Sequence, residues 1–104
     1  MESSSTVASA PINSYITGHH HSKSFWGPVI GEKLLCQHEP TNRYDTNAVA
    51  VVKENVVVGH VAKEHSLCVN RWIQDGKKVM AIVTGKRENK RRNGLEFPAR
   101  FVVE

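Results

Sequence analysis

The chain is short of the features that define secreted, membrane-spanning and disulfide-stabilised proteins. It has only two cysteines, Cys36 and Cys68. No apolar run approaches the roughly 18 residues that a membrane-spanning helix needs. The N-terminus lacks a basic start followed by an apolar block, so no secretory signal is expected. Two thiols without a signal peptide fit a reducing compartment, where they would be small buried hydrophobic residues.

The motifs of common enzyme classes are also missing. There is no glycine-rich phosphate loop, no Gly-x-Ser-x-Gly and no plausible pair of catalytic carboxylates. Cys36 and His38 are two positions apart and would share a face of a strand, but nothing nearby supplies an orienting Asp or an oxyanion turn. We therefore expect a protein that is not an enzyme and that needs no cofactor.

What the chain does have is the size of one domain and an excess of positive charge. It has 104 residues, 39% of them hydrophobic, and a net charge of +4, which fits a soluble globular domain with an anionic partner such as nucleic acid. The excess gathers in one segment, with the basic residues Lys86, Arg87, Lys90, Arg91 and Arg92. This segment is interpreted as a solvated loop that attracts polyanions without specificity.

Hydrophobic patterning predicts about six short strands and one short helix. Residues 1–13, rich in Ser, Thr and Ala at their start, are expected to be a disordered lead-in. The helix is expected over 63–74, with Leu67, Val69, Trp72 and Ile73 roughly on one face and Asp75-Gly76 as its end. Strands are expected over 14–19, 31–38, 47–52, 56–61, 78–85 and 95–103, with Pro98 at an edge or a bulge. The apolar run of the third strand, 47–52, predicts burial on both of its faces. This pattern favours a mainly β protein, a small closed or half-open barrel.

Candidate binding residues follow the second predicted strand. Tyr44 offers a ring on which a base can stack, and Asp45 offers a hydrogen-bond acceptor. His60 and Lys63 lie where the fourth strand enters the helix, and the lysine could meet a phosphate. Two alternatives stay open, because Asp45 could simply cap its own turn and Tyr44 could be an aromatic residue at the edge of the core.

A metal site is a weaker possibility. His19, His20 and His21 are consecutive, and Cys36, His38, His60 and His65 are further potential zinc ligands. Consecutive residues of a strand point to opposite faces, so at most two of the triplet could share a site. The spacing matches no zinc signature, and exposed polar residues at a strand end remain the plainer interpretation of the triplet.

Two segments together resemble a known family. Residues 39–49, with the pattern EPxNxYDxNAV, and residues 58–64, with the pattern VGHVxKE, are similar to the HIRAN domain, found at the N-terminus of helicase-like transcription factor and related fork-remodelling motors. The likeness extends from Tyr15 onward and implies a HIRAN-like domain over residues 14–104, either free-standing or part of a longer protein. It also implies an OB-like β-barrel with one or two short helices that binds single-stranded DNA at a free 3′ end.

The resemblance also implies roles for individual residues. Tyr44 would stack on the terminal base, Asp45 would accept from the 3′-hydroxyl, and Asn47 would support the turn. His60 and Lys63 would line the phosphate path. In the first strand the family's DNA binders carry Arg and Tyr where this chain has His20 and His21, and Leu95 stands where they carry a pocket aromatic. Neutral histidine clamps phosphate less well than arginine, so a weaker hold on the 3′ end is expected.

The expected protein is thus a monomer of the cell interior, in the nucleus rather than the cytoplasm, with single-stranded DNA as its partner and RNA as an open alternative. The competing hypothesis is a protein–protein interaction module on the same barrel that has lost DNA-end binding. Phe25 and Trp26 would then be its anchor, because tryptophan is enriched at binding hot spots. They could equally cover the core.

Overall fold

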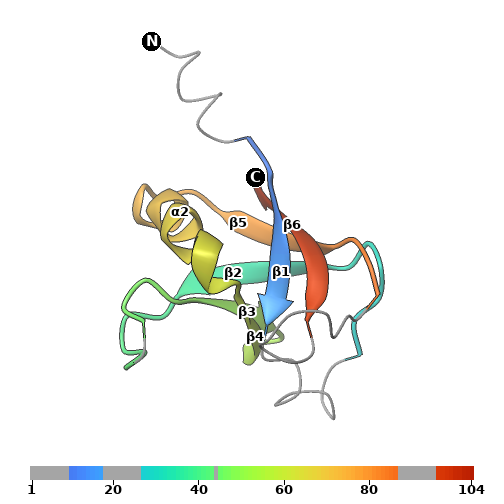
Figure 1. Cartoon of the computed structure of the whole chain (residues 1–104). Coiled ribbons are helices and arrows are strands. Elements are labelled where there is room, and N and C mark those ends of the chain that lie inside the picture. Colours follow the sequence, from blue (N-terminus) through green and yellow to red (C-terminus); the bar gives the residue numbers. More distant parts are fainter. Residues whose placement is uncertain (1–9, 18–26, 44, 87–95) are drawn as a thin grey trace.

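The computed structural model describes residues 10–17, 27–43, 45–86 and 96–104. In this part of the chain six strands form a closed antiparallel barrel in the order β1–β4–β3–β2–β5–β6. Figure 1 shows these strands with the helix on one side. The elements in chain order are β1 (Ile12–Thr17), β2 (Lys33–His38), β3 (Val49–Lys53), β4 (Val56–Val61), α2 (Lys63–Gln74), β5 (Val79–Val83) and β6 (Phe97–Val103). The predicted small β-barrel, with a helix between the fourth and fifth strands, is confirmed.

Side-chain alternation explains how the barrel is filled. In β5, Val79, Ala81 and Val83 are buried while Met80 and Ile82 are partly exposed, which is the period of a strand with one face inward. Strand β3 departs from this pattern, since its first four residues are all buried. The continuous apolar run had predicted burial on both faces, and this is confirmed.

Strands β3 and β4 are joined by a tight two-residue turn. Glu54 and Asn55 have φ angles of 51° and 68°, the left-handed conformation that both central residues of a type I′ hairpin turn require. Asparagine tolerates this conformation well, whereas glutamate does so less readily. The turn fixes the pairing of Lys53 with Val56. The register of β3 against β4 shifts between Val51 and Val52, before the turn.

The barrel closes between β1 and β4 over a short seam. Among the described residues, Ile16 pairs with Val61 and Thr17 with His60 there. Gly59 lies against this seam, and a Cβ at that position would be 2.6 Å from Cγ2 of Ile16 and 2.7 Å from the carbonyl oxygen of Thr17. Because the carbonyl belongs to the backbone, it cannot move aside cheaply, so the close approach of β1 and β4 depends on glycine at this position.

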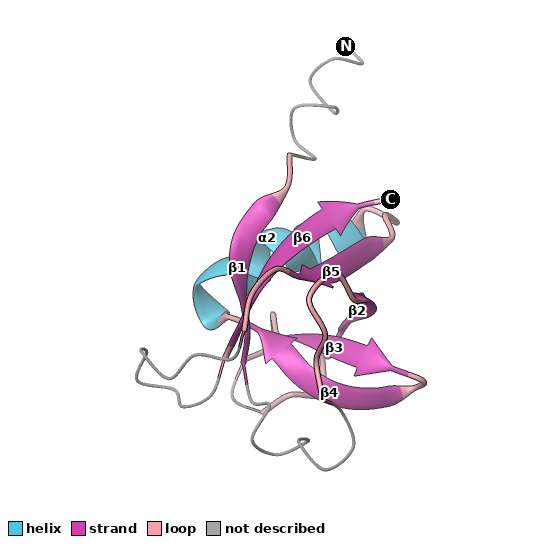
Figure 2. Cartoon of the chain, turned by 90° about the vertical axis from the view of Figure 1, so that its right-hand side faces the viewer, coloured by secondary structure: helices cyan, strands magenta, loops and turns pink. Residues whose placement is uncertain are grey.

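Helix α2 packs across one side of the barrel, as the turned view in Figure 2 shows. Val69 and Trp72 are buried in the main core and Ile73 packs against it. The helix ends as expected: Gly76 has a φ of 86°, its N–H donates to the carbonyl of Ile73, and the N–H of Lys77 donates to that of Trp72. These two bonds are the Schellman arrangement that glycine permits.

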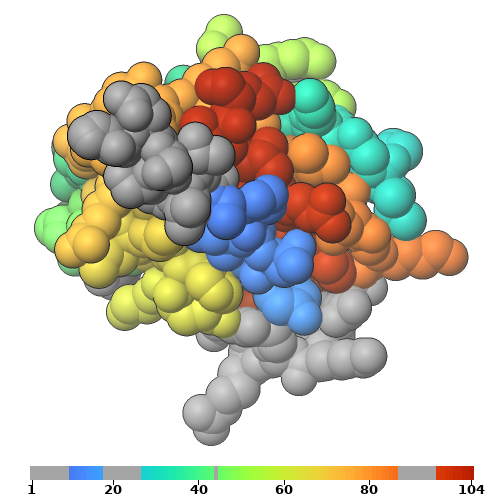
Figure 3. Space-filling model, turned by 90° about the horizontal axis from the view of Figure 1, so that it is seen from above, coloured from blue at the N-terminus to red at the C-terminus, as the bar shows by residue number. Residues whose placement is uncertain are grey.

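Seen from above in Figure 3, β1 lies between α2 and β6. Its pairing with β6 begins at Ile12 with Phe101 and Asn13 with Arg100. The predicted lead-in of residues 1–13 is therefore too long, because Ile12 and Asn13 belong to the barrel. A hydrogen bond of 2.7 Å between Ser14 Oγ and His65 Nδ1 ties the other flank of β1 to the helix.

Pro98 was predicted to mark an edge or a bulge. It pairs with Tyr15 of β1, but on its other side it lies beyond the last β5–β6 pair, Val83 with Ala99, and is thus at an edge on that side. Its missing N–H is tolerated there. Leu67 was grouped with the core face of the helix but is 48% exposed, because it precedes Val69 by two residues and so points about 200° away.

The two cysteines behave differently. Cys36 is buried, as expected, and desolvation raises the pKa of its thiol to about 12, so it stays protonated at neutral pH. Cys68 is exposed on α2, and its predicted burial is wrong. It lies one residue before Val69, off the face of the helix that enters the core.

Candidate nucleic-acid interface

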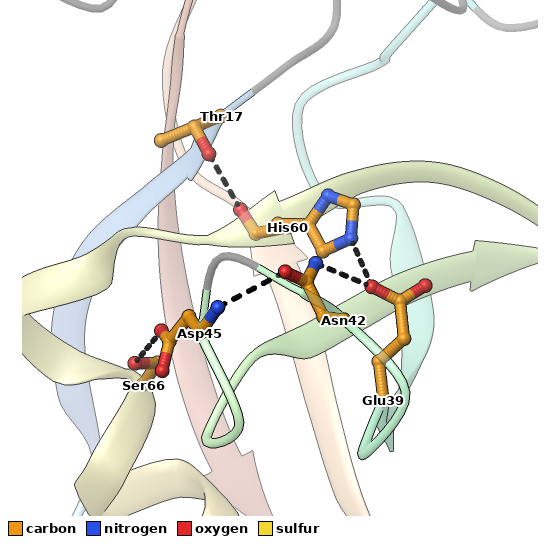
Figure 4. Close-up of polar contacts among 6 residues, drawn as sticks. All are labelled: Thr17, Glu39, Asn42, Asp45, His60 and Ser66. Carbon is orange, nitrogen blue, oxygen red and sulfur yellow. Dashed lines mark hydrogen bonds and ion pairs between the residues drawn. The ribbon is translucent and has the colours of Figure 1, made fainter.

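The turn between β2 and β3 lies beside α2, and polar side chains join the two. Figure 4 shows Asp45 and Ser66 from these segments facing each other, with Asn42, Glu39 and His60 beyond them. The turn is closed by backbone bonds from the N–H of Ala48 to the carbonyl of Asp45 and from the N–H of Glu39 to the carbonyl of Ala48. We call residues 39–48 the acceptor turn, because its central side chain is a carboxylate.

Both carboxylate oxygens of Asp45 have partners. Oδ1 accepts from the N–H of Asn47 at 2.9 Å, and Oδ2 accepts from Oγ of Ser66 at 3.2 Å. The N–H of Asp45 itself donates to Oδ1 of Asn42 at 3.1 Å. The alternative that Asp45 caps its own turn is therefore confirmed as a contact. Asp45 can still accept further hydrogen bonds, because each carboxylate oxygen has a second lone pair.

A second set of contacts joins the acceptor turn to β4. Oε1 of Glu39 accepts from Nδ2 of Asn42 at 3.0 Å and lies 2.8 Å from Nε2 of His60. A carboxylate only accepts, so the imidazole N–H donates here. The hydrogen bond from Asn42, followed by the bond and charge of His60, holds the pKa of Glu39 below its ordinary value despite partial burial. Asn42 thus links His60, through Glu39, to the backbone of Asp45.

Positive charge lies at the edge of this cluster. Lys63 is exposed in the first turn of α2, directly after the N-cap residue Ala62, which gives no side-chain hydrogen bond to the helix. The positive end of a helix dipole favours an anion there, although Glu64 in the same turn carries the opposite charge. Arg43, which the sequence analysis did not single out, is exposed on the acceptor turn itself.

Two buried polar residues of α2 also escaped the sequence analysis. Ser66 is 3% exposed and Asn70 is 7% exposed, and both face the acceptor turn. Nδ2 of Asn70 donates to Oδ1 of Asn47 at 3.3 Å. Their spacing of four residues was the available signal, because it places them on one helix face beside Val69 and Ile73.

The structure thus brings together Asp45, Asn47, His60 and Lys63 of the predicted site residues. Lys86 is exposed just beyond β5. The other predicted positions lie outside the described residues, namely Tyr44, His20, His21, Leu95, Arg87, Lys90, Arg91 and Arg92. The same holds for Phe25 and Trp26, the anchor of the alternative interaction module, and for His19 of the histidine triplet.

The remaining zinc-ligand candidates do not converge in the described ranges. There, no three His, Cys, Asp or Glu side chains are arranged to hold a metal ion. His38, His60 and His65 instead contact Thr46, Glu39 and Ser14 respectively. Nor does the described part of the chain contain a helix both long and apolar enough to cross a lipid bilayer.

Comparison with known proteins identifies one family. The model of the HIRAN domain matches residues 12–102. The crystal structure of the HIRAN domain of human HLTF is similar, with a TM-score of 0.67 and 22% identity over 89% of this chain and 74% of that one. A protein from Lactobacillus plantarum is similar at a TM-score of 0.64 and 19% identity, over 91% of this chain and 98% of that one. No curated protein sequence matches.

Proposed function

This chain belongs to the HIRAN domain family of DNA-binding modules, and on that premise we propose that it binds the free 3′ end of single-stranded DNA without catalysing a reaction. The observation that supports this proposal best is the position of Asp45. Its carboxylate is fixed from two sides by Asn47 and Ser66, while the exposed cations Lys63 and Arg43 lie on the adjoining helix turn and on its own loop.

A carboxylate in a phosphate-binding surface needs an explanation. It repels backbone phosphates, so it weakens general binding to DNA. The carboxylate favours binding where a hydroxyl donor stands in place of a phosphate. In a DNA strand this occurs at a terminus. Asp45 is half-buried, with lone pairs left over from its two internal bonds, so it can accept one more hydrogen bond at its exposed side. In this proposal it accepts from the terminal 3′-hydroxyl.

The cations then bind the phosphates of the strand that lie next to its terminus. Lys63, in the first turn of α2, binds a phosphate one or two nucleotides from the end, and Arg43 adds to the attraction. His60 is held by Glu39 beside this path, and its backbone carbonyl accepts from Oγ1 of Thr17 at 3.3 Å. Tyr44 is proposed to stack on the terminal base, and the loop around Lys86 contributes unspecific attraction.

The test compares oligonucleotides that differ only at the terminus. Fluorescence anisotropy should show tighter binding of a 3′-hydroxyl strand than of the same strand with a 3′-phosphate. Asp45→Ala should lower affinity for the 3′-hydroxyl strand about 10- to 100-fold, since hydrogen bonds to charged groups contribute about 1.5–3 kcal/mol. Weak general binding should remain, because the cations are intact.

Asp45→Asn is the matched control for charge. Its Oδ1 can still accept from the N–H of Asn47, so the acceptor turn keeps its main bond. Removing the negative charge should raise affinity for the 3′-phosphate strand and reduce the discrimination between the two ends. Equal affinity of the wild-type protein for both ends would reject the proposal. A strand ending in ribonucleotides, tested in parallel, establishes whether RNA is bound as well.

A further inference from the structure

We infer that a polar stripe on α2, made of Ser66, Asn70 and Gln74, positions the acceptor turn for binding of the strand end. This inference rests on the proposed function and deepens it, because it assigns the geometry of Asp45 to residues that need not touch DNA. The three residues are four positions apart, so they form one line along the helix. Each contacts the turn or the end of the strand that leads into it.

The first contact acts on the acceptor itself. Oγ of Ser66 lies 3.2 Å from Oδ2 of Asp45 and 3.0 Å from the carbonyl oxygen of Lys63. A hydroxyl carries one proton, so these two acceptors share it. This bond holds the Oδ2 side of the carboxylate against the helix while Oδ1 is held by the N–H of Asn47. With both oxygens anchored, the side chain is limited to one orientation.

The next contact acts on the turn behind Asp45. Nδ2 of Asn70 donates to Oδ1 of Asn47, and Oδ1 of Asn70 accepts from Nε2 of Gln74 at 3.3 Å. Both the oxygen and the nitrogen of the Asn70 amide therefore have a partner. Asn70 is almost fully buried, and a buried amide without its partners would be costly, so the arrangement resists rearrangement.

The last contact reaches the strand before the turn. Nε2 of Gln74 also donates to Nδ1 of His38 at 2.9 Å, and Nε2 of His38 faces the carbonyl oxygen of Thr46 at 2.8 Å. Since a carbonyl only accepts, the imidazole proton lies on Nε2, which suits the donor at Nδ1. The stripe thus holds the turn at Asp45, Thr46 and Asn47 from three consecutive turns of one helix.

A rigid acceptor discriminates better than a mobile one, because no conformational entropy is lost when the ligand binds. Ser66 and Asn70 are nearly inaccessible, so they act through the turn and are positioning residues. The test is the double variant Ser66→Ala/Asn70→Ala in the complete chain. The preference for a 3′-hydroxyl over a 3′-phosphate strand should fall about threefold to tenfold, the size of one or two lost hydrogen bonds, with the salt dependence of binding unchanged.

Three controls separate positioning from folding. Leu67→Ala changes an exposed residue of the same helix and should leave the preference unchanged. Ser66→Thr keeps the hydroxyl and, combined with native Asn70, should restore most of the preference. In a double-mutant cycle, adding Ser66→Ala to Asp45→Ala should cost little more, because Ser66 acts through Asp45.

A measurement without DNA distinguishes failure of this inference from failure of the proposed function. Amide hydrogen exchange of Asn47, whose N–H donates to Asp45, should be at least several-fold faster in the Ser66→Ala/Asn70→Ala variant. Unchanged exchange, or an unchanged end preference in that variant, overturns the inference while leaving the proposed function in place. Absence of any end preference in the wild-type protein rejects the proposed function and, with it, the role of the stripe.

Discussion

The two ends of strand β2 are built in contrasting ways. At its C-terminal end, after His38, the acceptor turn is tied to α2 and β4 by side-chain hydrogen bonds between half-buried or buried groups. At its N-terminal end, before Lys33, the polar contacts include ion pairs between long side chains: Lys33 with Glu104, which is exposed, and Lys53 with Glu32, which is partly buried, both at 2.8 Å. There, Val29 and Ile30 are 65% and 58% exposed.

The two ends differ in the length and flexibility of the side chains that pair. Ion pairs between long side chains contribute little, because these side chains lose entropy on pairing. Hydrogen bonds between short side chains such as Asp45 and Ser66 leave few rotamers open. We therefore place the recognition site at the C-terminal end of β2. Perturbing each end in turn tests this assignment.

The largest effect is expected at the seam that closes the barrel near His60. Gly59→Ala should destabilise the fold by about 1–3 kcal/mol or more, because the new methyl group would overlap the Thr17 carbonyl. Urea unfolding measures this loss. Gly27→Ala is the control, since a Cβ there meets no atom within 4 Å. Equal stability of the Gly59 variant and the control would show that β1 and β4 can separate without cost.

A smaller effect is expected for the cations near the two ends of β2. Lys63→Gln should weaken binding of single-stranded DNA severalfold at low salt and lower the slope of log affinity against log salt by about 0.7, the value for one phosphate contact. The loss should be the same for both kinds of 3′ terminus. Lys53→Gln, which removes a cation at the opposite end, should leave affinity and slope unchanged. A larger loss for Lys53→Gln would place the strand elsewhere.

The smallest effect concerns pH. The pKa of Glu39 is held low, first by the hydrogen bond from Asn42, so this carboxylate stabilises the fold above its unfolded pKa of about 4.3. That contribution is lost as the pH falls through the still lower pKa of the folded state. Glu39 is partly exposed, so it amounts to about 0.5 kcal/mol.

Asn42→Ala should remove most of this pH-dependent contribution. The stability difference between wild type and variant, measured by urea unfolding, should be larger at pH 7 than at pH 3. In the Glu39→Gln background, where residue 39 cannot ionise, the effect of Asn42→Ala on stability should be the same at both pH values. A difference that stays constant or grows towards pH 3 would contradict the assignment of the low pKa to Asn42.

Local sequence signals predicted most of the fold. The bounds of β4 and α2 follow directly from apolar periodicity and from the Asp75-Gly76 stop. The start of β1 could not be predicted this way. It depends on the pairing of Ile12 with Phe101, at the far end of the chain. This is set by tertiary pairing, which local propensity does not encode.

The sequence singled out those residues of the candidate site that lie in short motifs. Asp45, Asn47, His60 and Lys63 lie in two motifs that the fold brings together. Ser66 and Asn70 were missed because a serine and an asparagine in a helix are usually solvated, and only the acceptor turn packed over them makes them buried partners. The prediction for Leu67 was wrong for the converse reason, since an apolar residue alone does not define a helix face.

The most direct test is a map of amide chemical shifts while a short 3′-hydroxyl single strand is added to the isotope-labelled protein. The predicted result is that the shifts concentrate at Asp45, Asn47, His60 and Lys63 and leave Val29, Ile30 and Val56 unmoved. Shifts centred on Val29, Ile30 and Val56, or none at the acceptor turn when the strand is bound, would contradict a recognition site at the C-terminal end of β2.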